Sequence, residues 1–199
     1  MRTKLPVVLG AGALLVFGLR NDGLAVFTDT ATSTGNTFTT GTLDIKLGDG
    51  SATPSDSVTA SVAFNAMAPG DSVTRPVVVS NAGTNALRYA ISSAATNADS
   101  KALKDSLALV VKTADVTTPG TPCDNFDGTQ LYSGDLDSTA GKILGDSTSG
   151  AQTGDRTVAA GATETLCFQV SLALSAGNSL QGAATTATFT FDAEQTANN

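Results

Sequence analysis

The sequence contains no histidine in its 199 residues. Without histidine there is no Ser-His-Asp or Cys-His arrangement for nucleophilic catalysis and no H-E-x-x-H zinc helix. The side chain that most often acts as a general acid or base is also missing. Glu164 and Glu194 are the only glutamates. We therefore expect a protein that is not an enzyme, that has no catalytic residue and that binds no cofactor.

Basic residues are scarce, with 11 lysines and arginines against 18 aspartates and glutamates, and the net charge is −7. An acidic surface repels phosphate backbones, so nucleic acid is an unfavourable partner. The same charge keeps a protein soluble.

Long apolar runs are limited to one, residues 5–19, which is shorter than the roughly 20 residues that span a membrane. Arg2 and Lys4 precede the run, and Gly23 and Ala25 supply small residues after it. This order predicts a secretory signal peptide over residues 1–25, removed by a signal peptidase. The alternative is a membrane anchor. With cleavage, the chain is secreted and contacts the membrane only through the uncleaved signal peptide.

Cysteines number only two, Cys123 and Cys167. In an exported protein a disulfide is the default state of such a pair. The closed loop of about 45 residues corresponds to about 4 kcal/mol in the chain-entropy account. The alternative is a metal pair, but two thiolates without histidine make a poor zinc site.

Several segments alternate between apolar and polar side chains with a period of two, which predicts strands with one buried face. They are residues 43–47, 58–64, 87–91, 165–174 and 187–193. Short apolar runs at 77–79 and 109–111 predict more central strands, and residues 130–136 predict another short one. In the strand around Cys167, Leu166 and Phe168 face inward, so the cysteine faces outward toward the loop that carries Cys123.

A single helix is predicted over residues 99–107, because Asp99 or Ser100 can cap its start and Leu103 and Leu107 lie on one face. Residues 114–155 are rich in Gly, Asp, Ser and Thr and predict long loops. The fold class is therefore all-β, an antiparallel β-sandwich with one short inserted helix and long loops.

One acidic cluster comprises Asp124, Asp127, Asp135 and Asp137. Oxygen-rich loops bind calcium, but the spacing does not match an EF-hand loop. Aspartate and asparagine beside glycine are commonly turn formers. We expect no metal site, and calcium in this loop is the alternative.

The chain resembles the TasA/camelysin family of exported, fibre-forming matrix proteins. Residues 26–47 (VFTDTATSTGNTFTTGTLDIKL) are similar to the start of the mature family members, with an aromatic-Ser/Thr-Asp step before a Gly-Thr-Leu-Asp strand. Further similar segments follow in the family's order, at residues 67–75, 81–89, 131–136, 178–182 and 189–195.

This resemblance implies a jelly-roll-like sandwich over residues 37–199 and polymerisation into biofilm-matrix or cell-surface fibres. It also implies that the chain is its own partner, in a head-to-tail homopolymer. Residues 26–36 would act as a donor strand in the next subunit. The donor residues are Val26, Phe27, Thr28, Asp29, Thr30, Ala31, Thr32, Ser33 and Thr34.

Two other functions stay open. One is a monomeric exported surface or adhesion module. The other is a camelysin-like metalloendopeptidase, which a chain without histidine supports poorly because carboxylates or thiolates alone would have to hold the zinc.

Overall fold

Antiparallel strands joined by loops form the structure, a computed structural model that describes residues 40–50, 53–57, 66–117, 120–137 and 141–197. These residues belong to one compact unit, residues 39–199. The strands are β1 (Ile45–Gly48), β2 (Ser72–Asn81), β3 (Leu87–Ala95), β4 (Leu107–Thr113), β5 (Gln130–Asp135), β6 (Lys142–Leu144), β7 (Arg156–Val158), β8 (Thr163–Leu172) and β9 (Ala187–Gln195). In this part of the chain, no helix is long and apolar enough to cross a membrane.

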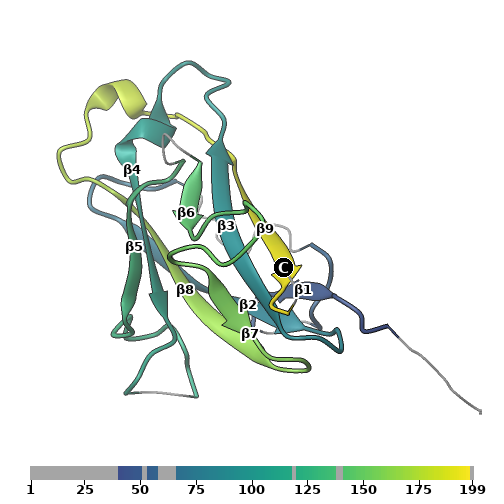
Figure 1. The fold of residues 1–199 in the computed structure, drawn as a ribbon. Helices are drawn as coiled ribbons and strands as arrows, with labels where there is room; N and C mark the ends of the chain where they lie inside the picture. Colours follow the sequence, from purple (N-terminus) through teal and green to yellow (C-terminus); the bar gives the residue numbers. More distant parts are fainter. Residues whose placement is uncertain (1–39, 51–52, 58–65, 118–119, 138–140, 198–199) are drawn as a thin grey trace, which may run out of the picture. The chain divides into compact units, whose positions relative to one another are not determined.

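The strands form two sheets (Figure 1). Five strands follow the order β1-β2-β8-β4-β5 in the first sheet. In the second, β3 pairs along its whole length with β9, while its other edge pairs with β7 near its start and with β6 further along. Every pairing is antiparallel.

The core lies between the two sheets, to which both contribute alternate side chains. Leu109 and Phe168 of the first sheet are 0% exposed, and Tyr89 of the second is 1% exposed. Phe168 also meets Phe189 of β9 in a T-shaped contact with ring centroids 5.2 Å apart. Burying one such aromatic side chain contributes about 1.5–3 kcal/mol. The predicted all-β antiparallel sandwich is therefore confirmed.

The predicted strands that fall on described residues are present. β1, β3, β8 and β9 contain most of the alternating segments, and β2, β4 and β5 contain the other three predicted strands. Two predicted strands are too long at one end, because Leu43 precedes β1, Leu174 follows β8, and both side chains are exposed rather than on a buried face. The strand predicted at residues 58–64, the signal peptide and the donor strand lie outside the described residues.

The predicted helix over residues 99–107 is wrong. Only one turn of 3-10 helix forms, at Leu103–Ser106, and β4 begins at once with Leu107. Ser100 and Ala102 both have a φ of 57°, in the left-handed region that interrupts a right-handed helix. The Asp99 carboxylate accepts one hydrogen bond from Lys101 N and another from Ala184 N. It therefore fastens this segment to the loop before β9.

The predicted loop region, residues 114–155, contains one strand that the sequence did not reveal, β6. β7 begins directly after this region. Each of these strands has only three residues, which is too short for a period-two pattern to be visible. Their apolar side chains, Ile143, Leu144 and Val158, are 3–6% exposed and belong to the core.

Candidate functional site

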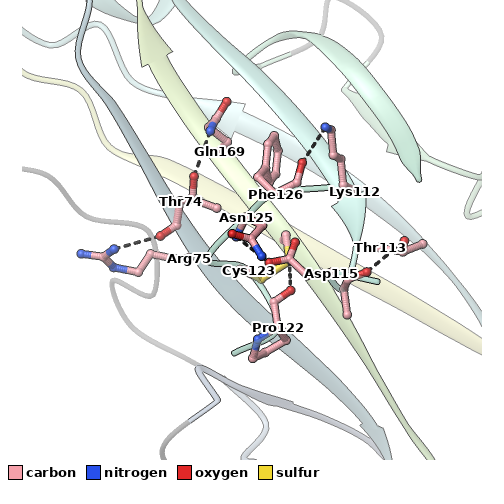
Figure 2. Close-up of a disulfide and its surroundings, with 12 residues drawn as sticks. Thr74, Arg75, Lys112, Thr113, Asp115, Pro122, Cys123, Asn125, Phe126 and Gln169 are labelled. Atoms are coloured by element: carbon pink, nitrogen blue, oxygen red, sulfur yellow. Dashed lines mark hydrogen bonds between the residues drawn. A yellow bond between two sulfur atoms is a disulfide. The ribbon is translucent and has the colours of Figure 1, made fainter. Parts of the chain in front are cut away.

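The covalent feature of the fold is a disulfide between Cys123 and Cys167, with an S–S distance of 2.01 Å (Figure 2). Cys167 lies on β8 between Leu166 and Phe168, which point into the core. It therefore faces the outer side of the five-stranded sheet, as the alternation predicted. The cysteine is nevertheless 0% exposed, since the loop that joins β4 to β5 covers this side of the sheet.

A buried carboxylate organises the same loop. Asp115 is 5% exposed, and its two oxygens accept hydrogen bonds from Asn125 N at 2.7 Å and Asp127 N at 3.1 Å. Asp115 N donates to Pro122 O at 2.7 Å. Two part-buried backbone N–H groups of the loop thereby have a side-chain acceptor. The loop thus has a hydrogen-bonded conformation of its own beside the disulfide.

Lys112, on the sheet, contacts the one residue of this loop, among those the structure describes, that has a positive φ and is not a glycine. Phe126 has a φ of 51°, which is uncommon for a residue other than glycine. Lys112 Nζ donates to Phe126 O at 2.8 Å and lies 4.4 Å from the centre of the phenylalanine ring. The hydrogen bond and the cation–π contact together stabilise this conformation.

A polar link that includes the buried Tyr89 joins the two sheets. The Tyr89 hydroxyl of β3 donates to Glu164 Oε2 of β8 at 2.7 Å, and Arg156 of β7 pairs with Glu164 Oε1. Burial and the adjacent Glu164 carboxylate raise the pKa of Tyr89 far above its usual value. The hydrogen-bonded Glu164 also raises the pKa of Arg156. The link joins β3 and β7 of the four-stranded sheet to β8 of the five-stranded sheet, so its role is structural.

The acidic cluster that the sequence suggested for calcium does not converge. Asp127 accepts hydrogen bonds from Val116 N and Thr117 Oγ1, which hold its pKa below the usual range. Asp137 pairs instead with Lys104, with an N–O distance of 2.9 Å. Asp135 belongs to β5, and Asp124 lies in the turn after Pro122. Among the described residues, no group of three or more His, Cys, Asp or Glu side chains is placed to hold a metal ion.

Strand β9 forms an edge of its sheet, since among the described residues it pairs only with β3. Its inward side chains pack against the core but stay half-buried, whereas Tyr89, Ile91 and Ser93, which lie opposite three of them on β3, are buried. The inward side chains of β9 are Ala187, Phe189, Phe191 and Ala193. An apolar side chain with this much exposure can bury more surface when another strand is added.

The described part of the chain is thus an antiparallel β-sandwich protein with a covalently fixed surface loop. The sequence profile of the camelysin metallo-endopeptidase family matches residues 4–199, and the chain belongs to this family. The match confirms the resemblance to the TasA/camelysin family. A search of curated proteins found no match.

The family's description implies a catalytic metal, and the donor set of this chain does not fit one. Histidine is absent from the sequence, and both thiols are joined in the disulfide. The carboxylates near the loop are occupied by backbone groups or lysines. A zinc site of the usual nitrogen and sulfur ligands therefore has no ligands in this chain.

Sequence reasoning found the disulfide but missed Asp115 and the Tyr89–Glu164–Arg156 link. Asp115 follows β4 and looks like an ordinary turn residue, because its partners lie ten and twelve residues away. Glu164 was visible as one of only two glutamates. Its partners come from separate strands, so no local pattern could have shown them.

Proposed function

We propose that this chain is a structural subunit of extracellular fibres, on the cell surface or in a biofilm matrix. The subunits assemble after the signal peptide has been removed. In this proposal residues 26–36 of one subunit add a strand to the sheet of the next. The contact is head-to-tail and does not close on itself, so it propagates as a filament.

The observation that carries this proposal is the edge strand β9. Its outer edge has no strand partner among the described residues. Its inward side chains Phe189 and Phe191 remain half-buried. Addition of a strand there provides main-chain hydrogen bonds and covers apolar surface, which is the basis of β-augmentation. An open edge is an aggregation hazard unless it is covered or used.

The donor segment fits this role by composition. Residues 26–36 are rich in threonine and have one large side chain, Phe27. They have β propensity but little apolar surface with which to bind their own core. Eleven extended residues reach about 36 Å, enough to cross a neighbouring sandwich. While the signal peptide is attached the segment is tethered to the membrane, so cleavage acts as the switch for assembly.

Deleting residues 26–35 is the direct test of the donor strand. The variant is expected to fold with unchanged circular dichroism, to stay monomeric and to bind a synthetic peptide of residues 26–36. A peptide of the same composition in scrambled order is the matched control and is expected to bind much more weakly. Normal fibres from the deletion variant would end the proposal.

A metalloendopeptidase is the second candidate, favoured by the description of the family. The chemistry of the donor set argues against it, and we propose that the chain is not an enzyme. Peptidase assays with added zinc, and with a chelator, separate the two. We expect no activity in either condition. Cleavage that co-purifies with the chain and is lost when its aspartates are changed would establish the enzyme instead.

A further inference from the structure

A small polar cavity lies beside the outer face of the four-stranded sheet, between strands β3 and β9 and the loop that follows β6. The cavity has a volume of about 40 Å³. The side chains that line it and matter here are Arg88, Ala90, Asp146, Ser147, Asp155 and Asp192. Of these residues, Asp192 alone lies on β9, the strand of the fibre contact proposed above.

One buried charge points to an occupant. Arg88 is 8% exposed, and its Nε pairs with Glu194 Oε1. The same glutamate oxygen accepts a hydrogen bond from Gly150 N at 3.0 Å. Arg88 Nη2 is also buried, yet it has no acceptor among the described residues. A buried guanidinium N–H without an acceptor is strongly unfavourable, so the site calls for an acceptor from outside the chain.

The loop cannot readily move to supply that acceptor. Asp155 Oδ1 accepts from Asp146 N at 3.0 Å, and Oδ2 accepts from Gln152 N at 2.7 Å. Gly145 has a φ of 65°, and a Cβ at this position would lie 2.4 Å from Asp155 Oδ1. The loop therefore packs closely around Asp155, and its hydrogen bonds hold the walls of the cavity in place.

We propose that this cavity is a site for ordered water. One water accepts a hydrogen bond from Arg88 Nη2 and donates to a carboxylate of the lining. A water needs about 10–15 Å³, so the cavity has room for about three. The carboxylates repel an anion, and the guanidinium repels a metal cation. A neutral molecule that both donates and accepts satisfies the two kinds of group at once.

A crystal structure of the full-length chain, grown without divalent metals and then soaked in calcium chloride, tests the site. The expected result in both is a water within normal hydrogen-bond distance, about 2.7–3.2 Å, of Arg88 Nη2. The water is expected to be lost in Arg88→Lys, which keeps a cation for Glu194 but has no Nη2. It is expected to stay in the control Arg75→Lys, because Arg75 is exposed and its side chain donates to Thr74 O, away from the cavity lining.

Nuclear magnetic resonance of the wild-type chain provides a second readout that needs neither a variant nor a crystal. Cross-relaxation between the Arg88 guanidinium protons and a long-lived water supports the proposal. A dry cavity, an Arg88 Nη2 bound to a protein acceptor, or a calcium peak in the soaked crystal would overturn it.

Discussion

Removing the disulfide is the perturbation whose effect follows most directly from the structure. Cys123→Ala/Cys167→Ala eliminates the bond without adding a polar group to a buried site, since the two cysteines are 7% and 0% exposed. The loop keeps its other anchors, the Asp115 hydrogen bonds and the contact of Lys112 with Phe126. The double variant is therefore expected to fold in the same conformation.

The magnitude follows from the chain that the bond closes. The two cysteines are separated by 44 positions. The chain-entropy account then gives an entropy loss of about 13 cal/mol/K in the unfolded state, or about 4 kcal/mol at 25 °C. Native stabilities are about 5–15 kcal/mol, so this is a large share of the total. The loss of sulfur packing adds to the destabilisation.

Equilibrium urea unfolding of the oxidised chain and of the double variant measures the difference. The variant is expected to lose about 4 kcal/mol and to show a larger m-value, because its unfolded state is no longer held compact. The oxidised chain treated with reductant in urea serves as a control and should match the variant. A loss below about 1 kcal/mol would refute the entropic reasoning.

Three further predictions concern single side chains. Asp115→Ala removes the acceptor of two backbone N–H groups and is expected to lower the free energy of unfolding in urea by about 1–3 kcal/mol. Phe168→Ala, in the core, is expected to lower it by about 3–5 kcal/mol. The reverse order would contradict the burial of Phe168. Lys142 holds the pKa of the Asp146 carboxyl well below its usual range. The Lys142–Asp146 pair therefore stabilises the fold above the ordinary aspartate pKa, and this stabilisation is lost as the pH falls through the lowered pKa of Asp146. Lys142→Met should shift the Asp146 titration upward by nuclear magnetic resonance, and an unchanged titration would argue against the ion pair. Burial raises the pKa of Tyr89. The protonated Tyr89 therefore contributes its full share of stability below about pH 10, and this stability is lost as the pH rises through the raised pKa. Absorbance at 295 nm should show Tyr89 ionising only as the chain unfolds, and earlier ionisation would contradict its burial.

The sequence was sufficient for the elements whose signal is local. The 165–174 segment alternates over ten residues, and all but its last two residues lie in β8, the central strand of the first sheet. The same alternation placed Cys167 on the outer face, where the disulfide forms. The helix prediction failed because a capping residue and two leucines four apart are also compatible with a turn that leads into a strand. Tertiary contacts of Asp99 decided between the two.

The sites that could not be predicted are those built from distant residues. Arg88, on β3, meets Glu194, on β9, across 106 positions. Both residues lie in segments that resemble the family, but nothing within either segment shows that the two side chains meet. The open edge at β9 is likewise a property of sheet order, which period-two alternation does not encode, because the central strand β8 and the edge strand β9 both alternate.

The central claim, that the chain is a fibre subunit, is tested most directly by negative-stain electron microscopy of the purified protein without residues 1–25, over a range of concentrations. The account predicts filaments of uniform width whose number rises with concentration. It also predicts that the deletion of residues 26–35 abolishes them. A leader-free chain that stays monomeric at every concentration would contradict the claim and would favour a monomeric surface module.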